Sequence, residues 1–241
     1  MQLVAYGAQD IYLTGNPQIT FFKVVYRRHT NFSMEAIEQT FNGTVDFGNR
    51  VTATISRNGD LVSRMYVQFD PSAVFDGAGT GAVTPYAGNS LIKEVSVEIG
   101  GQLIDRHYNH WLNTWADLTE LNPGKAVGGV ANDLWVVDNS GGSGLNLPPP
   151  TMYQKMSFNG KTGASDFEFI NFATVPLQFW FCRNPGLALP LIALQYHEVK
   201  IIMEIQTATL LTARGSTDAS SIKLFADYIY LDTDERRRFA Q

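Results

Sequence analysis

Few side chains in this chain have the types and the spacing that chemistry requires. The densest group is Asp105-Arg-His107-Tyr-Asn-His110, which offers one carboxylate and two imidazoles to a metal ion. Asp105 and His107 alternate along a predicted strand, whereas His110 begins the helical pattern that follows. Because structural zinc normally has four ligands at defined spacings, we favour a structural role for these residues over a metal site.

The other candidates for catalysis are isolated. His197-Glu198 stands at the entry to a predicted strand, where such a pair is more often a structural hydrogen bond than an acid–base dyad. Cys182 has no neighbouring histidine and follows an apolar run, which favours a buried filler. Gly77-Ala-Gly-Thr-Gly81 lacks the Lys-Ser/Thr of a phosphate-binding loop. We therefore predict that the protein is not an enzyme and that it has no catalytic residues, metal ligands or cofactor.

The charge of the chain argues against nucleic acid as a partner. Its 241 residues include 18 Lys and Arg against 23 Asp and Glu, so the net charge is −5. The only basic clusters are Arg27-Arg28 and Arg236-Arg237-Arg238, too few for the several phosphate contacts that nonspecific binding needs. Arginine forms bidentate pairs with carboxylates, so these clusters suit contacts between subunits or between halves of a protein.

The chain also lacks the sequence signals of export and membrane insertion. No apolar run reaches the roughly 18 residues that mark a transmembrane helix, so we predict no transmembrane segment. Met1–Tyr6 has no basic and apolar pattern of a signal peptide. A single cysteine, Cys182, fits a reducing compartment such as the cytosol.

Apolar and polar residues alternate with period two through most of the chain, which predicts β-strands. The alternating runs are residues 51–56, 61–69, 94–99, 175–181, 199–205 and 222–230. Asn58-Gly59 and Gly100-Gly101 separate consecutive runs and predict two hairpins, because both residues of each pair tolerate positive φ. Several antiparallel strands with turns between them predict a sandwich or a barrel.

Three kinds of segment interrupt the strands. Trp111, Leu112, Trp115, Leu118 and Leu121 follow helical spacing, and Asn122-Pro-Gly ends that helix. Leu187–Leu194 is apolar but flanked and broken by Pro185 and Pro190, so we expect a buried corner that leads into the strand at 199–205. Long Gly-rich loops are expected at 71–88, 122–150 and 159–165.

Several segments resemble one known family. They are Gly7–Lys23, Tyr26–Phe32, Ser56–Asp60, Ile99–Tyr108, Asn184–Lys200 and Asp232–Gln241. They are similar, in the same order, to the major capsid proteins of large icosahedral DNA viruses of eukaryotes, the nucleocytoplasmic large DNA viruses. The resemblance implies an all-β fold, an eight-stranded antiparallel jelly-roll sandwich with helical insertions in its loops, as the first half of a double jelly roll.

The resemblance also implies a division of the chain. Residues 1–24 correspond to a segment at the base of the capsomer, 25–233 to the first jelly-roll domain, and 234–241 to the start of a linker to a second jelly roll that this chain lacks. We expect the chain to be a piece of a longer product rather than a single-jelly-roll relative.

The function implied by the resemblance is structural. A major capsid protein of this family self-assembles into homotrimeric, pseudo-hexagonal capsomers that tile an icosahedral virion shell, assembled in the host cell cytoplasm. The implied partners are neighbouring capsomers and the minor capsid and penton proteins, close to an internal viral membrane and without specific nucleic-acid binding. Because fold does not determine function, a carbohydrate-binding, lectin-like jelly roll is the alternative, and a jelly-roll enzyme would need a clustered metal site.

Overall fold

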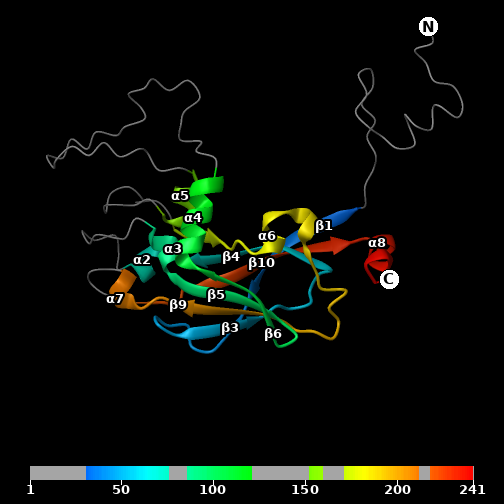
Figure 1. The fold of residues 1–241 in the computed structure, drawn as a ribbon, viewed down its shortest axis with the longest axis horizontal. Helices are drawn as coiled ribbons and strands as arrows, with labels where there is room; N and C mark the ends of the chain where they lie inside the picture. Colours follow the sequence, from blue (N-terminus) through cyan, green and yellow to red (C-terminus); the bar gives the residue numbers. More distant parts are fainter. Residues whose placement is uncertain (1–30, 76–85, 121–151, 160–170, 212–217, 241) are drawn as a thin grey trace, which may run out of the picture.

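The computed structural model describes residues 31–75, 86–120, 152–159, 171–211 and 218–240, which form a sandwich of two antiparallel β-sheets (Figure 1). Sheet A contains β1 (Phe32–Gln39), β10 (Lys223–Leu231), β4 (Leu61–Phe69), β7 (Ala173–Pro176) and β8 (Leu189–Pro190). Sheet B contains β2 (Phe41–Asn42), β3 (Arg50–Thr54), β9 (Val199–Ile205), β5 (Ile92–Ile99) and β6 (Gln102–Tyr108).

The strand order is that of a jelly roll. β2 and β8 are each 2 residues long, and without them the described strands number eight, four to a sheet. Counted along the chain, these eight lie in the order 1-8-3-6 in sheet A and 2-7-4-5 in sheet B. Consecutive strands therefore mostly belong to opposite sheets, as in two interleaved Greek keys. The predicted all-β jelly-roll sandwich is confirmed.

The core lies between the two sheets and is built from the alternating residues that the sequence indicated. The inward side chains with almost no exposure come from both sheets: Val51, Ala53, Met65, Val67, Phe69, Val95, Val97, Ile201, Met203, Leu224, Ala226 and Tyr228. Inner faces of packed sheets are apolar because every second residue of each strand points into the same layer.

Short helices lie in the connections between the strands and after β10. They are α2 (Pro71–Val74), α3 (Ala87–Ser90), α4 (Asn109–Thr119), α5 (Met152–Ser157), α6 (Trp180–Arg183), η3 (Pro185–Leu187), α7 (Ala208–Leu211) and α8 (Thr233–Ala240). α2 to α5 and α7 lie at one end of the sandwich, whereas α8 and the start of β1 lie at the other (Figure 1). The predicted helix is confirmed as α4, although Leu118, which we assigned to its apolar face, is 78% exposed.

One predicted hairpin is confirmed and the other is wrong. Gly100 and Gly101 have φ of +59° and +84° and join β5 to β6. Asn58-Gly59 instead lies on the connection from β3 in sheet B to β4 in sheet A, which are not paired. Glycine is needed there for space, because a Cβ on Gly59 would lie 3.0 Å from the Cβ of Tyr228.

The segment from residue 175 to 194 is less regular than the alternation predicted. Val175, Leu177, Phe179 and Phe181 are all buried, but β7 ends at Pro176 and the chain turns into α6. In the expected buried corner, Leu189 and Leu191 are buried, whereas Leu187 is 53% exposed. The two prolines confine the corner to a short helix and a two-residue edge strand.

Gly88 is the tightest point of the helical end. An added Cβ would lie 1.7 Å from the carbonyl oxygen of Ser157 on α5. We expect Gly88→Ala to lower the free energy of unfolding by about 2–4 kcal/mol, because the backbones of α3 and α5 must separate. Urea denaturation measures this loss. Ser90→Ala on the same helix is the control and should change stability by less than about 0.5 kcal/mol; equal effects of the two changes would contradict the packing described.

Candidate functional site

The candidate metal group is only partly assembled. The Nε2 atom of His107 lies 3.1 Å from Oδ2 of Asp105, and its ring stacks on Phe179 with centroids 4.9 Å apart. His110 stacks instead on Tyr108. Within the described residues, no group of three His, Cys, Asp or Glu side chains could hold a metal ion.

His107 is a buried core residue with an electrostatic environment that disfavours its charged form. Burial lowers the pKa of His107 below its ordinary value of 6.5, and the positive charge of Arg183 lowers it further, while Asp105 opposes both. Arg183 itself lies over the ring of Trp115, 4.3 Å from its centroid. These contacts join β6, α4 and α6 at one edge of the sandwich.

The other residues considered for chemistry have structural surroundings. Burial raises the pKa of Cys182 to about 12, so the thiol stays protonated at neutral pH and is a poor nucleophile. Glu198 forms an ion pair with Lys200 at 3.2 Å. His197 packs so close to the turn after β5 that a Cβ on Gly100 would lie 2.7 Å from its Nδ1. Gly77–Gly81 and Arg27-Arg28 lie outside the described residues.

The connection Ser56–Asp60, here called the sheet connector, holds together segments that are far apart in sequence. The guanidinium of Arg57 donates hydrogen bonds to three backbone carbonyls, those of Leu194, Gln195 and His197. Nη2 lies 2.6 Å from the Leu194 oxygen and 3.2 Å from the His197 oxygen. The planar guanidinium of arginine can donate hydrogen bonds to several acceptors at once. This one side chain therefore stabilises the turn that precedes β9.

Asp60 places a carboxylate inside the protein at the other end of the connector. Its side chain is 6% exposed; Oδ1 lies 2.8 Å from Nε of Arg236, and Oδ2 accepts a hydrogen bond of 2.7 Å from the backbone N–H of Leu231. Its own N–H donates to Ile229, and its carbonyl accepts from Ile192. A buried carboxylate is tolerated only when it is paired and hydrogen-bonded, so α8 must lie where Arg236 can reach it.

Ser56 connects the sheet connector to both β1 and β10 of sheet A. Its N–H donates to Oε1 of Gln39 at 3.0 Å, and its carbonyl oxygen lies 2.6 Å from the hydroxyl of Tyr228. Burial raises the pKa of Tyr228 to about 12, so the hydroxyl remains a donor at neutral pH. We did not predict the contacts of Ser56, Arg57 and Asp60 from the sequence, because we interpreted Asn58-Gly59 between them as a hairpin turn.

The arginine triplet near the end of the chain is divided in role. Arg236 forms the pair with Asp60, and Arg237 is exposed. The side chain of Arg238 is outside the described part. Arg236 thus pairs with a carboxylate of its own sandwich, and the predicted role of the cluster in contacts between subunits or between halves of the protein stays a prediction.

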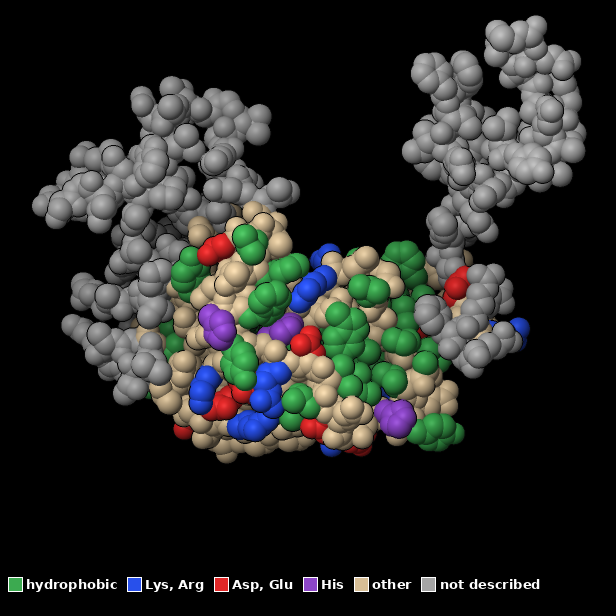
Figure 2. Space-filling model, in the orientation of Figure 1, with side chains coloured by type: hydrophobic (Ala, Val, Ile, Leu, Met, Phe, Trp, Pro, Cys, Tyr) green, Lys and Arg blue, Asp and Glu red, His purple; other side chains and the backbone are tan. Residues whose placement is uncertain are grey.

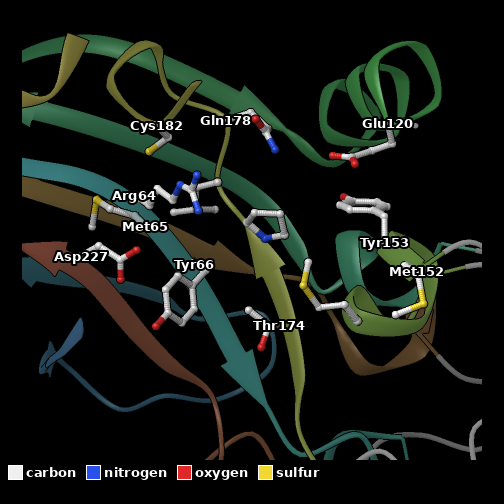
Figure 3. Close-up of a pocket in the computed structure, with 13 residues that line it drawn as sticks. Arg64, Met65, Tyr66, Glu120, Met152, Tyr153, Thr174, Gln178, Cys182 and Asp227 are labelled. Carbon is white, nitrogen blue, oxygen red and sulfur yellow. The ribbon is translucent and has the colours of Figure 1, made fainter. Parts of the chain in front are cut away.

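The surface of the sandwich is uneven in polarity. On the face shown in Figure 2, hydrophobic side chains gather on the side toward β1 and α8, and most charged ones lie toward the opposite side. A pocket of about 740 Å³ opens beside sheet A between α5 and α6 (Figure 3). Its walls include Arg64, Tyr66, Met152, Tyr153, Met156, Cys182 and Asp227.

The wall of the pocket is mostly apolar. Asp227 of β10 contributes a partly buried carboxyl group to this wall. Burial raises the pKa of Asp227, against the opposing effect of Arg64. Nothing in the sequence pointed to this pocket, because its walls come from segments that are distant along the chain.

Among the described helices, none has the length and apolar character needed to cross a bilayer.

The Arg57 fork can be tested by substitution. We expect Arg57→Ala to lower the free energy of unfolding by about 1 kcal/mol, because three hydrogen bonds are lost at a site where water can partly replace them. Arg57→Lys keeps the charge but not the fork and should recover less than half of the loss in urea denaturation. Full recovery by lysine would show that charge alone matters.

His107 should make the fold sensitive to mild acid. A folded-state pKa below the ordinary 6.5 means that the unfolded chain binds the proton more readily. The stability contributed by neutral His107 is therefore present above pH 6.5 and is lost as the pH falls toward and through the lowered pKa. Thermal melts between about pH 7.5 and pH 5 should show a smaller decline for His107→Gln than for the parent. Identical slopes would rule out this assignment.

Comparison with known proteins places the chain in a family. A family model described as the major capsid protein N-terminus matches residues 20–232. The major capsid protein of Pyramimonas orientalis virus is 54% identical over 241 residues, which cover 100% of this chain and 55% of the relative. That of Paramecium bursaria Chlorella virus 1 is 45% identical over 246 residues, covering 100% of this chain and 49% of the relative.

A solved structure agrees with the sequence relatives. One chain in a quasi-atomic model of the PBCV-1 virus capsid superimposes with a TM-score of 0.68 at 38% identity, over 92% of this chain and 48% of that one. The chain thus spans about half the length of the curated relatives it matches. With a jelly-roll strand order and this similarity along its whole length, the chain belongs to the major capsid protein family of large DNA viruses.

Proposed function

We propose that this chain is the N-terminal jelly roll of a capsid protein whose role is structural and not enzymatic. The observation that carries the proposal is the jelly-roll strand order along a chain that matches the major capsid protein N-terminus from residue 20 to 232. The candidate chemical groups support it as well, since the ring of His107 stacks on Phe179 and Cys182 packs against the core. The protein would reside in the capsid shell of the virion and assemble in the host cell cytoplasm.

The physical properties of the sandwich suit a rigid structural element of a capsid shell. Two hydrogen-bonded sheets around one core resist deformation, and the connecting loops emerge at the two ends. Charged residues make up 17% of the chain, below the about 25% typical of soluble proteins, which supports burial of part of the surface by neighbours.

The assembly we propose is a homotrimer. If each subunit carries two similar jelly rolls, a trimer presents six similar sandwiches around its axis and has a pseudo-hexagonal outline that tiles an icosahedral shell. Neighbouring capsomers, minor capsid proteins and penton proteins are the further partners, near an internal viral membrane. Residues 1–24, proposed as the capsomer base, lie outside the described residues, and the proposed linker 234–241 begins within α8.

The alternatives have less support. The relatives named above are capsid proteins, which does not favour a carbohydrate-binding jelly roll. A jelly-roll enzyme would need a clustered metal site, and the described residues contain no such cluster.

Assembly can be measured directly. We expect the chain, expressed together with its downstream coding sequence, to form a stable trimer in multi-angle light scattering at micromolar concentration. The 241-residue chain alone is the comparison and should be less soluble, because surface meant for other parts of the assembly is exposed. A lengthened protein that stays monomeric would contradict the proposed assembly.

A further inference from the structure

One edge of the sandwich gathers an imidazole, a guanidinium and two indole rings. This edge cluster consists of His107 of β6, Trp111 and Trp115 of α4, and Arg183 of α6. The ring of His107 contacts those of Phe179 and Trp111, whose centroids are 4.9 Å and 5.9 Å away. The rings of Trp111 and Trp115 are in turn 5.7 Å apart. The cluster therefore packs α4 and α6 onto β6, which lies at the edge of sheet B.

Arg183 is held in the edge cluster by a backbone carbonyl and by the two indoles. Its Nε donates a hydrogen bond of 2.9 Å to the carbonyl oxygen of Gln178. Its guanidinium carbon lies 4.3 Å from the ring centroid of Trp115 and 5.6 Å from that of Trp111. Because a cation is attracted to the electron-rich face of an indole, Arg183 adds one fixed positive charge to the cluster.

The hydrogen bonds of His107 suit its neutral form. Nε2 lies 3.1 Å from Oδ2 of Asp105, so the proton of the neutral ring resides on Nε2 and Nδ1 carries a lone pair. Nδ1 is buried and has no hydrogen-bond partner among the described residues, and the same holds for Nε1 of Trp111. Protonation would turn Nδ1 into a buried N–H donor without an acceptor, next to an indole that offers only another N–H.

The charges around His107 come from two elements. Burial lowers the pKa of His107, Asp105 on the same strand opposes this effect, and Arg183 of α6 lowers the pKa further. The cross-strand neighbour on β5 is the apolar Val95, which contributes no charge. The cationic ring is therefore disfavoured by its surroundings as well as by its hydrogen bonds.

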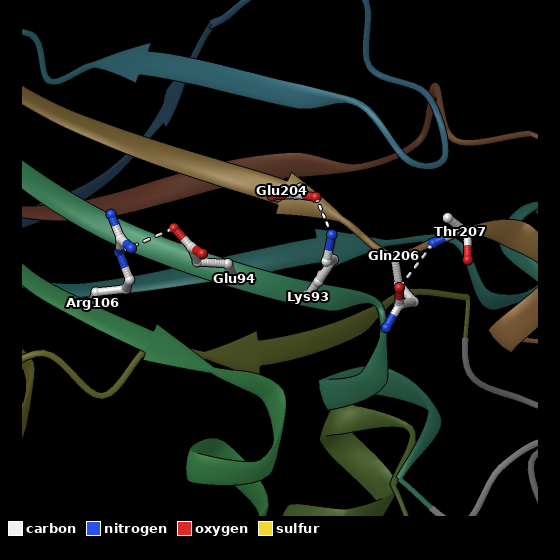
Figure 4. A network of polar contacts seen from close by, with 6 residues as sticks. All are labelled: Lys93, Glu94, Arg106, Glu204, Gln206 and Thr207. Atoms are coloured by element: carbon white, nitrogen blue, oxygen red, sulfur yellow. Dashed lines mark hydrogen bonds and ion pairs between the residues drawn. The ribbon is translucent and has the colours of Figure 1, made fainter.

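The other charged and titratable groups beside His107 along β5, β6 and α4 have partners of their own. Nε of Arg106 on β6 lies 3.1 Å from Oε1 of Glu94 on β5 (Figure 4). His110, in the first turn of α4, stacks on Tyr108 with centroids 5.6 Å apart. The charged groups that act on His107 itself are thus the carboxylate of β6 and the guanidinium of α6 named above.

We propose that the edge cluster is an acid-operated clasp, which holds α4 and α6 on β6 while His107 is neutral and releases this edge when His107 gains a proton. The protonated ring adds a second cation near Arg183 and an unpaired N–H near Trp111, and opening the edge lets water solvate both. α4 can open locally because, of its 11 residues, it buries only Leu112 and Ala116.

The release would also reach the pocket beside sheet A. Gln178 accepts the hydrogen bond from Arg183, Cys182 directly precedes Arg183, and both Gln178 and Cys182 line that pocket (Figure 3). A movement of α6 therefore changes the pocket wall together with the edge. In a capsid shell, this clasp would let mild acid loosen one edge of each sandwich while its two sheets stay closed, a response that a structural role alone does not require.

Amide hydrogen exchange tests the clasp in the protein lengthened by its downstream coding sequence. Peptide mass spectrometry follows exchange at about pH 7.5 and about pH 5, and each rate is divided by the intrinsic exchange rate at that pH. We expect the protection of α4 to fall about three- to tenfold between these pH values, because the clasp is lost as the pH falls through the pKa of His107. The protection of β9 and β10 should change by less than about twofold.

Three substitutions separate the clasp from a general effect of acid. His107→Gln is neutral at both pH values and should abolish the fall in α4 protection. Arg183→Gln removes the second cation and should reduce the fall, because the protonated ring then has no like charge beside it; this variant decides the matter if His107→Gln does not fold. His110→Gln is the matched control: His110 is exposed on the same segment, so the fall should equal that of the parent.

Three results would overturn the proposal. Unchanged protection of α4 at the two pH values would mean that the edge does not respond to acid. An equal fall in the parent and in His107→Gln would assign the response to other groups. A common fall in α4, β9 and β10 would mean that acid unfolds the whole sandwich and that no separate edge opens. None of these results bears on assembly, which the trimer measurement tests independently.

Discussion

The buried carboxylate of Asp60 constrains one whole end of the sandwich. A charge removed from water needs a counter-charge and hydrogen-bond donors, and here Arg236 and the N–H of Leu231 provide them. One group therefore determines how β4 begins, how β10 ends and where α8 packs. The neighbouring Arg57 extends the same connector to the turn before β9, so the two sheets are joined by polar contacts as well as by the core.

Beyond this connector, the sandwich has two different outer surfaces around one core. Sheet B carries the ion pairs Lys93–Glu204 and Arg106–Glu94 beside the exposed Ile104 and Tyr108 of β6, whereas sheet A carries the Glu38–Lys223 pair beside exposed apolar side chains of β1 and the pocket.

Much of the fold could be predicted from the sequence because alternation depends on local geometry alone. Val199 to Ile205 points every second side chain inward whatever its partners are, and the helical spacing of Trp111, Leu112 and Trp115 likewise indicates α4. The Asn58-Gly59 turn was misassigned because its sequence permits a tight hairpin, while the choice between a hairpin and a crossing to the other sheet depends on the distant strands with which β3 and β4 pair, here β9 and β10. Leu118 was misassigned for a similar reason. Helical spacing indicates which residues share one face of α4, but only the packing of α4 against the sandwich decides how many of them are buried.

By itself, the sequence determined the class of the fold, the strands β3, β4, β5, β9 and β10 with their core residues, and, through long similar segments, the family. The tertiary structure alone decided that Asp60 meets Arg236, that Arg57 caps the turn at Leu194, and that residues of β4, β10, α5 and α6 enclose a pocket. The physical reason is that side-chain periodicity is a property of neighbouring residues, whereas charge pairing and pocket shape depend on which distant segments the closed sandwich brings within a few ångströms.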